Sequence, residues 1–381
     1  MLPVTEWRIY KLDELGSVGR GKSRHRPRND ESLYGGNYPF FQTGDIKAAN
    51  FHLTEYSQTY NEKGLAQSKL WQPDTLCITI AANIAETAIL GIPGCFPDSV
   101  VGFVPDSEKT DVRFIKYYVD TIKLQMQSAS RGTTQDNLSV DKLLSFDFFV
   151  PPLSMQRRIA DILSAYDELI ENNQRRIRIL EEMARSLYRK WFVHYRYPGN
   201  DSVPLVDSPL GQIPQGWVVQ KLGDIIDLNY GKALKKEDRR DGVYPVFGSS
   251  GVVGTHDTAL VKGPGIIVGR KGNVGSVFWC DNDFFVIDTA YFVTSSIPLR
   301  FLFYVLPTLN FINSDAAVPG LSRNQAYTLE VMVPPASLLE KFCELAGTFE
   351  HQLAMLQRQT ANLQRTRDLL LPRLLSGQVN L

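Results

Sequence analysis

Two long stretches of the chain place apolar side chains at alternating spacings of four and three residues. One follows Ser154, and the other follows Ser337 with the same alternation shifted by 183 positions. A sustained mean spacing of 3.5 residues is typical of a coiled-coil seam. The pattern predicts two helices of about 40 residues, each roughly 60 Å long. Their seam positions are Ile159, Leu163, Tyr166, Ile170, Asn173, Ile177, Leu180, Ala184, Leu187 and Trp191, then Phe342, Ala346, Phe349, Leu353, Leu356, Thr360, Leu363, Arg367, Leu370 and Leu374.

We expect these two helices to pack on each other. Asn173 is a polar residue among the apolar positions of the first seam. A lone polar seam residue can fix the register of a helix pair, or it can mark a point where the seam is open to solvent. The sequence leaves both interpretations open.

The rest of the chain reads as mixed α/β domains. Short apolar runs bounded by turn residues predict strands. Each half also has one expected helix before its last loop, Asp111–Ser128 in the first half and Leu299–Asn313 in the second. The predicted strands are Leu76–Ile80, Val100–Val104, Ile266–Val268, Val277–Trp279 and Phe284–Val286.

The sequence contains an internal repeat that covers most of its length. Both halves open with Trp-x-x-x-Lys-Leu and continue to a Gly-Lys pair at a common offset of 210, whereas both close on Leu-Ser and Val-Pro-Pro at an offset of 183. The shared order indicates a duplicated domain whose second copy has shorter loops. The matched segments are Trp7–Leu12 with Trp217–Leu222, Gly21-Lys22 with Gly231-Lys232, Tyr38–Phe41 with Tyr244–Phe247, Leu138-Ser139 with Leu321-Ser322, and Val150–Pro152 with Val333–Pro335.

These patterns predict five segments. Proline and glycine are frequent between Tyr197 and Pro214, which indicates a connector between the repeats. We expect a first domain over 1–152, a central helix over 153–196, the connector over 197–214, a second domain over 215–335 and a C-terminal helix over 336–381.

The composition narrows the possible classes of protein but does not identify a function. The 41 basic and 41 acidic residues cancel, whereas a protein that binds nucleic acid alone usually has a basic excess. DNA binding then requires locally clustered cations or a partner that shares the phosphate contacts. Four cysteines without a Cys-x-x-Cys pair argue against a zinc site and favour a reduced, cytoplasmic protein. The first residues lack the features of a signal peptide, and the longest apolar stretch, 299–312, is too short to span a membrane.

Three segments resemble enzyme motifs but lack the neighbouring residues or the spacing that those motifs require. Gly16–Ser23 matches the phosphate-loop pattern, but Arg24–Arg28 cannot begin the helix that such a loop requires, and Ile226 replaces the first glycine in the repeat. The two Val-Pro-Pro segments lack the polar residue and the aromatic of an amino-methyltransferase motif. The acidic turn Pro105–Lys109 lacks nuclease spacing. We therefore predict that the chain is not itself an enzyme.

The whole chain resembles the specificity (S) subunits of type I restriction–modification systems. The resemblance rests on the order of domain, long helix, domain, long helix, and on local features of the sequence. The second half departs from the first, because Pro319–Ser322 stands where the first half has a Thr-Gln loop. The features are the Trp-x-x-x-Lys-Leu openings, the loop Gly132–Leu138, the Val-Pro-Pro segments with Gln156–Ile159, the segment Asn172–Val193 and the terminal Leu370–Gly377.

The resemblance implies an α+β fold, with two pseudo-repeated mixed α/β target recognition domains separated by two long antiparallel coiled-coil helices. Each domain would read one half of a split, asymmetric double-stranded DNA site. Two modification subunits would dock on the helices and methylate adenine with S-adenosylmethionine, which they bind themselves, so that this chain needs no cofactor or metal. Restriction motor-nuclease subunits would complete the complex. The alternative function is a protein-binding coiled-coil scaffold.

Candidate DNA contacts begin with a basic run of the first half. It has no acidic residue before Asp30, and Pro27 indicates a loop. Such cations can hold phosphates or read a guanine edge, although a solvated surface loop has the same composition. The counterpart in the second half is diluted by Asp238 and Asp241. The residues are Arg20, Lys22, Arg24, Arg26 and Arg28, with Lys232, Lys235, Lys236, Arg239 and Arg240 in the counterpart.

Three polar groups complete the candidates. Gln42 and Thr43, with Ser249 and Ser250 in the repeat, stand beside glycines, where short side chains can approach bases but where ordinary turns also occur. A polar loop after the first domain's helix offers a glutamine that could bond an adenine edge, or it could simply pack on the helix. A basic segment between two strands of the second half predicts a hairpin tip. The loop contributes Arg131, Thr133, Thr134 and Gln135, and the tip contributes Arg270, Lys271 and Asn273.

Overall fold

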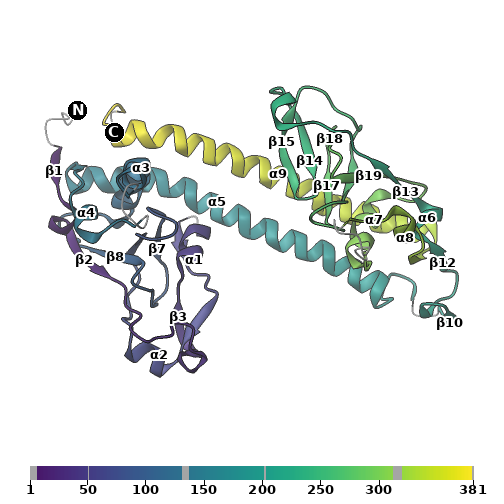
Figure 1. The fold of residues 1–381 in the computed structure, drawn as a ribbon, viewed down its shortest axis with the longest axis horizontal. Coiled ribbons are helices and arrows are strands. Elements are labelled where there is room, and N and C mark those ends of the chain that lie inside the picture. The colour runs from purple at the N-terminus through teal and green to yellow at the C-terminus, as the bar shows by residue number, and fades with distance from the viewer. Residues whose placement is uncertain (1–6, 50, 131–136, 201–202, 312–319, 380–381) are drawn as a thin grey trace. The chain divides into compact units, whose positions relative to one another are not determined.

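The chain divides into two compact units in the computed structural model (Figure 1). The structure describes residues 7–49, 51–130, 137–200, 203–311 and 320–379. One unit combines Met1–Arg176 with Leu356–Leu381, and the other is Ile177–Met355. Both units contain part of each long helix, α5 (Leu153–Tyr188) and α9 (Ala336–Leu375).

A five-stranded sheet forms the centre of the first unit, in the order β2-β8-β6-β7-β4. All four residues of β6 are buried, because the sheet is covered on both faces. Leu76 and Ile78 join a cluster with Phe114 of α3, whereas Cys77 between them faces a second cluster that contains Trp71. The strands are β2 (Gly16–Arg20), β4 (His52–Leu53), β6 (Leu76–Thr79), β7 (Thr87–Leu90) and β8 (Val100–Pro105), and the helices are α1 (Thr43–Ala48), α2 (Glu62–Ala66), α3 (Val112–Ser130) and α4 (Val140–Leu144).

The start and the end of the first domain pair with each other. Strand β1 (Arg8–Tyr10) runs antiparallel to β9 (Phe148–Val150), and α5 begins three residues after β9. Lys11, from the opening motif, bonds through Nζ to Asp147 at 2.6 Å. The Trp-x-x-x-Lys-Leu and Val-Pro-Pro segments therefore close the domain at the base of its long helix. A further pair joins β3 (Tyr34–Phe40) to β5 (Gln58–Tyr60).

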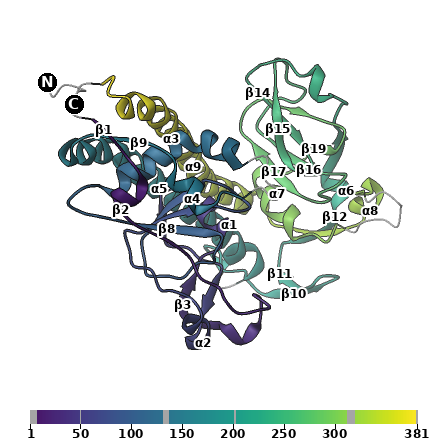
Figure 2. The ribbon, with the colours of Figure 1, turned by 60° about the vertical axis from the view of Figure 1, so that its left-hand side comes forward.

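The second unit repeats this plan with the sheet order β13-β19-β16-β17. Ile266 and Val268 of β16 pack toward Phe301 of α7, and Ile267 between them faces the opposite cluster. Helix α7 lies against β16, β17 and β19 (Figure 2). The strands of this sheet are β13 (Ile226–Tyr230), β16 (Gly265–Gly269), β17 (Val277–Cys280) and β19 (Ala290–Ser295), with the closing pair β12 (Val218–Lys221) and β20 (Glu330–Val333).

Two parts of the second domain differ from the first. Strand β14 (Tyr244–Gly248) turns directly into β15 (Gly251–His256) and pairs with β18 (Phe285–Val286), whereas β3 leads into a helix. The helix expected over Leu299–Asn313 is shorter than predicted. Helix α7 (Leu299–Val305) gives way to a 3-10 turn, Leu306–Thr308, where Pro307 lacks the backbone N–H that the next α-helical hydrogen bond would use. The remaining helices are α6 (Leu222–Ile225) and α8 (Arg323–Tyr327).

The seam prediction is confirmed, since every predicted seam position of both helices is buried or partly buried. In the first unit Leu374 near the end of α9 shares a core with Ile159 near the start of α5. In the second unit Phe342 near the start of α9 contacts Trp191 just after α5. The helices therefore run antiparallel in each unit. Asn173 is only 7% exposed, so the interpretation as a solvated seam position is wrong.

Helix α5 and the connector depart in detail from the expectations. Helix α5 ends at Tyr188 and continues as a π-helical turn over Arg189–Val193. The proline-rich connector contains an antiparallel hairpin of β10 (Leu205–Ser208) and β11 (Gly211–Pro214). Ile213 of this hairpin is buried in the core of the second unit. The end of the connector is thus part of the second domain's packing.

Candidate nucleic-acid interface

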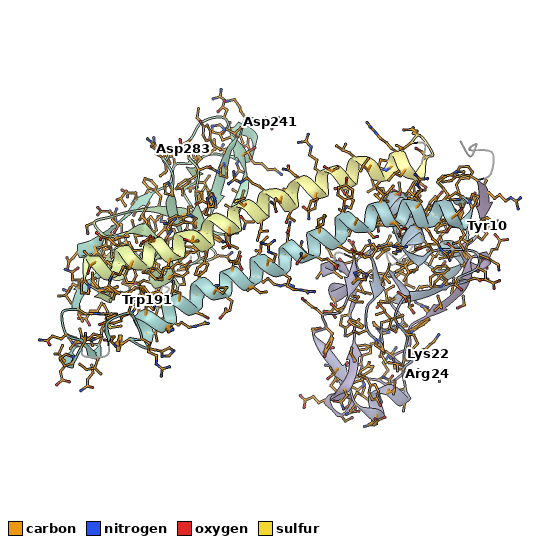
Figure 3. The ribbon with its side chains drawn as sticks, turned by 180° about the vertical axis from the view of Figure 1, so that it is seen from behind. Tyr10, Lys22, Arg24, Trp191, Asp241 and Asp283 are labelled. Carbon is orange, nitrogen blue, oxygen red and sulfur yellow. The ribbon has the colours of Figure 1, made fainter. Side chains whose placement is uncertain are left out.

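The basic segment of the first domain follows directly from strand β2. Lys22 and Arg24 are exposed and lie together on a part of the domain remote from the long helix (Figure 3). The backbone amides of Arg24 and His25 both donate to Oε1 of Gln67, at 2.6 and 3.0 Å. Because side-chain bonds fix its backbone, the segment is an ordered loop.

The five cations of this loop are not equivalent. Arg28 Nη2 contacts both carboxylate oxygens of Asp98, at 2.7 and 2.8 Å, and Arg20 Nε donates to the carbonyl of the same residue. Arg26 folds back onto the carbonyls of its own loop. Within the described residues, Lys22 and Arg24 form no ion pair with a carboxylate. These two cations therefore have the most charge available for a nucleic acid.

Lys69 joins this group although the sequence analysis did not single it out. Its Nζ lies 3.4 Å from the centre of the Trp71 ring. Burial lowers the pKa of Lys69, and the positive charge of Lys22 lowers it further. Two ammonium groups that disfavour each other's charge create a local site for an anion. Only the tertiary fold reveals it, because Lys69 and Lys22 are far apart in sequence.

In the counterpart loop of the second domain, the two arginines already contact other groups of that domain. Arg239 Nη1 donates to the carbonyl of Val253 at 2.6 Å, and Arg240 lies 3.3 Å from Asp257. The exposed lysines have no ion pair within the described residues. The charge available here comes from Lys232, Lys235 and Lys236.

The predicted hairpin tip is confirmed. Arg270, Lys271 and Asn273 lie in the loop between the antiparallel strands β16 and β17. The first domain has the same loop between β6 and β7, with matching bends and turns over Ile80–Glu86 and Arg270–Ser276. The repeat pattern in the sequence did not reveal this equivalence, because the first loop has Ile80-Ala81 at the positions where the second has Arg270-Lys271. The backbone reveals it through positive φ angles at Ala82 and Ala85 and at Gly272 and Gly275.

The short polar candidates occupy structural turns. Gln42 precedes α1, where its backbone amide donates to Asp45 and its side-chain amide donates to Gln58 at 3.0 Å. Thr43 is the first residue of that helix. Ser249 and Ser250 form the turn between β14 and β15, and the Ser249 carbonyl accepts a bond from Ser276 in the neighbouring hairpin loop.

Four candidates of the first domain, Arg131, Thr133, Thr134 and Gln135, lie outside the described residues. The structure does describe the residues that directly follow them. Asn137 bridges to Ala81, and the Leu138 amide donates to the Ile80 carbonyl at 2.8 Å. The described end of this loop thus meets the β6–β7 hairpin.

The Gly-Lys pairs have a structural cause. Gly16–Arg20 is a β-strand paired with β8, not a phosphate loop. A Cβ on Gly21 would lie 2.3 Å from the Pro97 carbonyl oxygen, and one on Gly231 would lie 2.2 Å from that of Ile287. Both glycines are required because two backbone segments pass at close range. The lysine that follows is thereby held at the same place in each domain.

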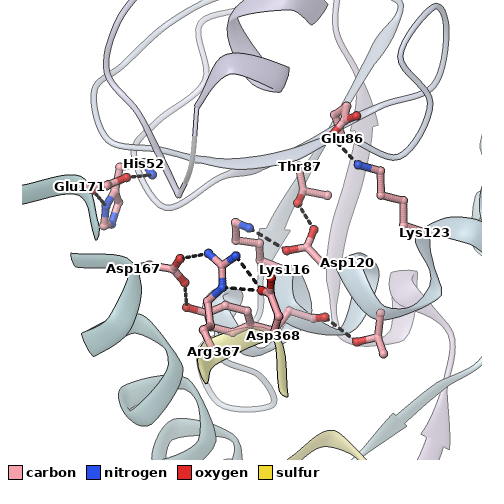
Figure 4. Close-up of polar contacts among 12 residues, drawn as sticks. His52, Glu86, Thr87, Lys116, Asp120, Lys123, Asp167, Glu171, Arg367 and Asp368 are labelled. Atoms are coloured by element: carbon pink, nitrogen blue, oxygen red, sulfur yellow. Dashed lines mark hydrogen bonds and ion pairs between the residues drawn. The ribbon is translucent and has the colours of Figure 1, made fainter. Parts of the chain in front are cut away.

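A polar cluster attaches the first domain to the long helices (Figure 4). The Tyr117 hydroxyl of α3 donates to Asp167 of α5, which also accepts from Arg367 of α9. The His52 backbone and ring bond to Glu171 at 3.0 and 3.2 Å. Both links fix the orientation of the recognition domain on its helix.

Gln156, noted from the sequence, acts at the same junction. Gln156 is 1% exposed, and its side-chain amide accepts from Thr110 Oγ1 and the Asp111 amide and donates to the Lys109 and Pro151 carbonyls. All its bonding capacity is thus used in joining the α3 entrance to α5. In the described part of the chain, no helix combines the length and apolarity that a bilayer crossing requires, and no group of three acidic, histidine or cysteine side chains could hold a metal ion.

Comparisons with known proteins agree with this architecture. The family model for the type I restriction modification DNA specificity domain matches residues 5–182 and again 214–338. The specificity subunit of the type I restriction enzyme MjaIX from Methanocaldococcus jannaschii is 23% identical over 98% of this chain and 94% of its own length. That of the enzyme EcoprrI from Escherichia coli is 22% identical over 82% of each chain.

A solved structure supports the fold. The S subunit of a type I restriction-modification system from M. genitalium matches with a TM-score of 0.65 and 19% identity, over 97% of this chain and 96% of that one. Two repeated α/β domains with paired long helices and exposed cations beside the sheet define a duplicated DNA-recognition protein. The chain belongs to the family of type I restriction–modification specificity subunits. Its role is DNA target recognition within such a complex rather than catalysis, as the sequence predicted.

Proposed function

We propose that the chain reads a split, asymmetric DNA site, one half with each domain. The observation that supports this proposal is that the two domains share one backbone arrangement but have different side chains at equivalent loop positions. The sheet order and the hairpin loop are repeated, yet the first domain has Ile80-Ala81 where the second has Arg270-Lys271. A shared framework supports the same mode of DNA contact, and different side chains support different bases in the two half-sites.

The contacts we assign follow the available charge. Lys22, Arg24 and Lys69 hold phosphates in the first domain, and Lys232, Lys235 and Lys236 do so in the second. Each neutralised phosphate releases counterions, so the affinity falls as salt rises. The hairpin loop residues Lys271 and Asn273 approach the bases.

The long helices provide the attachment for the other subunits of the type I complex. We propose that two modification subunits bind α5 and α9, one for each repeat, and bind the S-adenosylmethionine with which they methylate adenine. Motor-nuclease subunits join that assembly. The four cysteines, Cys77, Cys95, Cys280 and Cys343, are all free thiols, which supports a reducing, cytoplasmic location.

A methylation map tests the proposal. The chain is produced together with its methyltransferase subunit in a host without adenine methylation, and the DNA is sequenced for modified bases. A split motif with a different sequence in each half and methylated adenine in both is the expected result. If the two proteins associate but no new methylation arises, the proposed function is wrong.

A further inference from the structure

Three elements of the second domain meet at the exposed ring of Tyr230, which ends strand β13 and is 48% exposed. The Arg270 guanidinium carbon lies 4.8 Å from the ring centre, and that of Arg323 lies 5.0 Å from it. Arg270 comes from the hairpin loop, and Arg323 begins helix α8. The two guanidinium carbons are thus at most about 10 Å apart, a separation close to the Debye length of about 8 Å at physiological salt.

Both guanidinium groups are held in place. Arg270 Nη1 donates to the Asp288 carbonyl at 3.1 Å, and Arg323 Nη1 donates to the Leu228 carbonyl at 3.4 Å. The backbones are joined as well, because the Leu321 amide donates to the Arg270 carbonyl at 2.8 Å. Arg270 also lies 5.8 Å from the centre of the Tyr291 ring. A guanidinium has five N–H donors, so each arginine keeps donors beyond these contacts that can bind a ligand.

Among the described residues, no carboxylate pairs with either arginine. Within the described residues, neither Arg270 nor Arg323 forms an ion pair, although the chain as a whole carries equal numbers of acidic and basic residues. In the first domain, by contrast, Arg28 is paired with Asp98. Two fixed, unneutralised cations around one ring favour an anionic ligand between them.

The first domain has a related arginine contact, which bears on the kind of anion that the site suits. Arg20 Nε donates to the carbonyl of Asp98, which has the same position before β8 that Asp288 has before β19. An arginine side chain therefore donates to the equivalent carbonyl in both domains. This arginine lies at the end of β2 in the first domain and in the hairpin loop in the second. A feature common to two domains with different half-sites suits the part of DNA that does not vary with sequence, which is the phosphate backbone.

We propose that Arg323 and Arg270, oriented by Tyr230, form a clamp for a DNA backbone phosphate in the second half-site. Arg323 is then a DNA-contacting residue that the sequence pattern did not indicate, because its role depends on the stack with Tyr230. The clamp positions the duplex and does not itself read bases. This inference rests on the proposed DNA recognition by the second domain.

Salt titrations of DNA binding by the full chain assembled with its methyltransferase subunits test the clamp. Arg270→Gln and Arg323→Gln should each weaken binding and reduce the slope of log affinity against log salt by about 1. Lys262→Gln removes the same charge at the opposite end of β16 and should leave the slope unchanged. Tyr230→Phe keeps the ring and should behave like the wild type, whereas Tyr230→Ala should resemble the arginine variants. Unfolding midpoints equal to that of the wild type exclude a folding defect.

The outcomes separate the two proposals. Slopes for Arg270→Gln and Arg323→Gln equal to that of Lys262→Gln overturn the clamp while the wild-type slope still supports DNA recognition. A methylation motif that loses one base in the Arg323→Gln complex also overturns it, since the residue then reads a base. A wild-type complex without salt-dependent DNA binding contradicts the proposed function itself.

Discussion

Tyr117 and Asp167 are joined by a hydrogen bond that ties helix α3 to the long helix α5. The second unit repeats this bond, because the Tyr304 hydroxyl of α7 donates to Glu350 of α9 at 3.4 Å. Asp167 and Glu350 differ by 183 positions, the same offset as the two seams. Each recognition domain is therefore bonded to its long helix in the same way.

Charge differs between the two bonds. Arg367 of α9 pairs with Asp167, which is 1% exposed, whereas Arg300 of α7 pairs with Glu350 at 2.5 Å. Burial raises the pKa of Tyr117 above its usual range, and the negative charge of Asp167 raises it further. The hydroxyl therefore stays protonated and remains a donor. The first link also connects both long helices, since its members come from α3, α5 and α9.

Removing the shared acceptor should loosen the first domain on its helix. Asp167→Ala leaves Arg367 and the Tyr117 hydroxyl without their buried partner, and we expect it to lower the free energy of unfolding by about 2–3 kcal/mol. Urea denaturation of the purified chain measures this loss. Glu168→Ala changes the exposed neighbour and should cost less than about 0.5 kcal/mol. Equal losses for both variants would contradict the role of the buried bond.

A charge in the seam should separate the long helices. Leu363→Glu places a carboxylate at a partly buried seam position and should cost about 2–4 kcal/mol, with loss of co-purification of the methyltransferase subunit. Leu180→Glu should act in the same way. Asn362→Glu adds the same charge on the exposed neighbour and should assemble normally. Normal assembly of the Leu363→Glu chain would show that the seam does not support docking.

The His52–Glu171 bond should make the first domain sensitive to pH. The hydrogen bond to Glu171 raises the pKa of His52, and the charges of Glu168 and Asp74 add to it against the opposing effect of burial. A raised folded pKa stabilises the domain below the unfolded value of about 6.5 and loses that contribution as pH rises through the folded pKa. The unfolding midpoint of the wild type should therefore exceed that of His52→Gln most at pH 6. A difference independent of pH from 6 to 9 would refute this.

The cations of the first basic loop should contribute unequally to DNA binding. Lys22→Gln with Arg24→Gln should weaken binding to all sequences and reduce the salt slope by about 2, because both charges are available for phosphates. Arg28→Gln removes a charge already paired with Asp98 and should have a smaller effect. Titration of the assembled complex at several salt concentrations compares the variants. A larger effect of Arg28→Gln would reverse the assignment.

The equivalent hairpin loops predict opposite effects of reciprocal substitutions. Ala82 is exposed at a φ of 63°, where a side chain is strained, and Gly272 has the equivalent position at 78°. Ala82→Gly should stabilise the first domain by about 1 kcal/mol, and Gly272→Ala should destabilise the second by about as much. Thermal unfolding of the two variants measures both. Changes of the same sign would contradict the structural equivalence of the loops.

The sequence by itself determined the duplication and the two seams. The heptad spacing after Ser154 and Ser337 depends only on local helix geometry, and the paired motifs define the order of elements whatever their contacts. That order was enough to identify the family. The hairpin around Arg270 was also predictable, because turn residues separate two apolar runs.

The tertiary structure alone decided which polar residues act together. Arg28 meets Asp98 across 70 positions, so a run that looked uniformly basic contains one neutralised arginine, two arginines bonded to backbone carbonyls and two available cations. Lys69 gains its candidate role from Lys22 and Arg323 gains its role from Tyr230, partners that long-range packing brings to them. The equivalence of the two hairpin loops lies in the backbone, where alanine and glycine adopt the same conformation. Local periodicity specifies elements, whereas the pairing of charges depends on sheet order and loop closure, which no local pattern encodes.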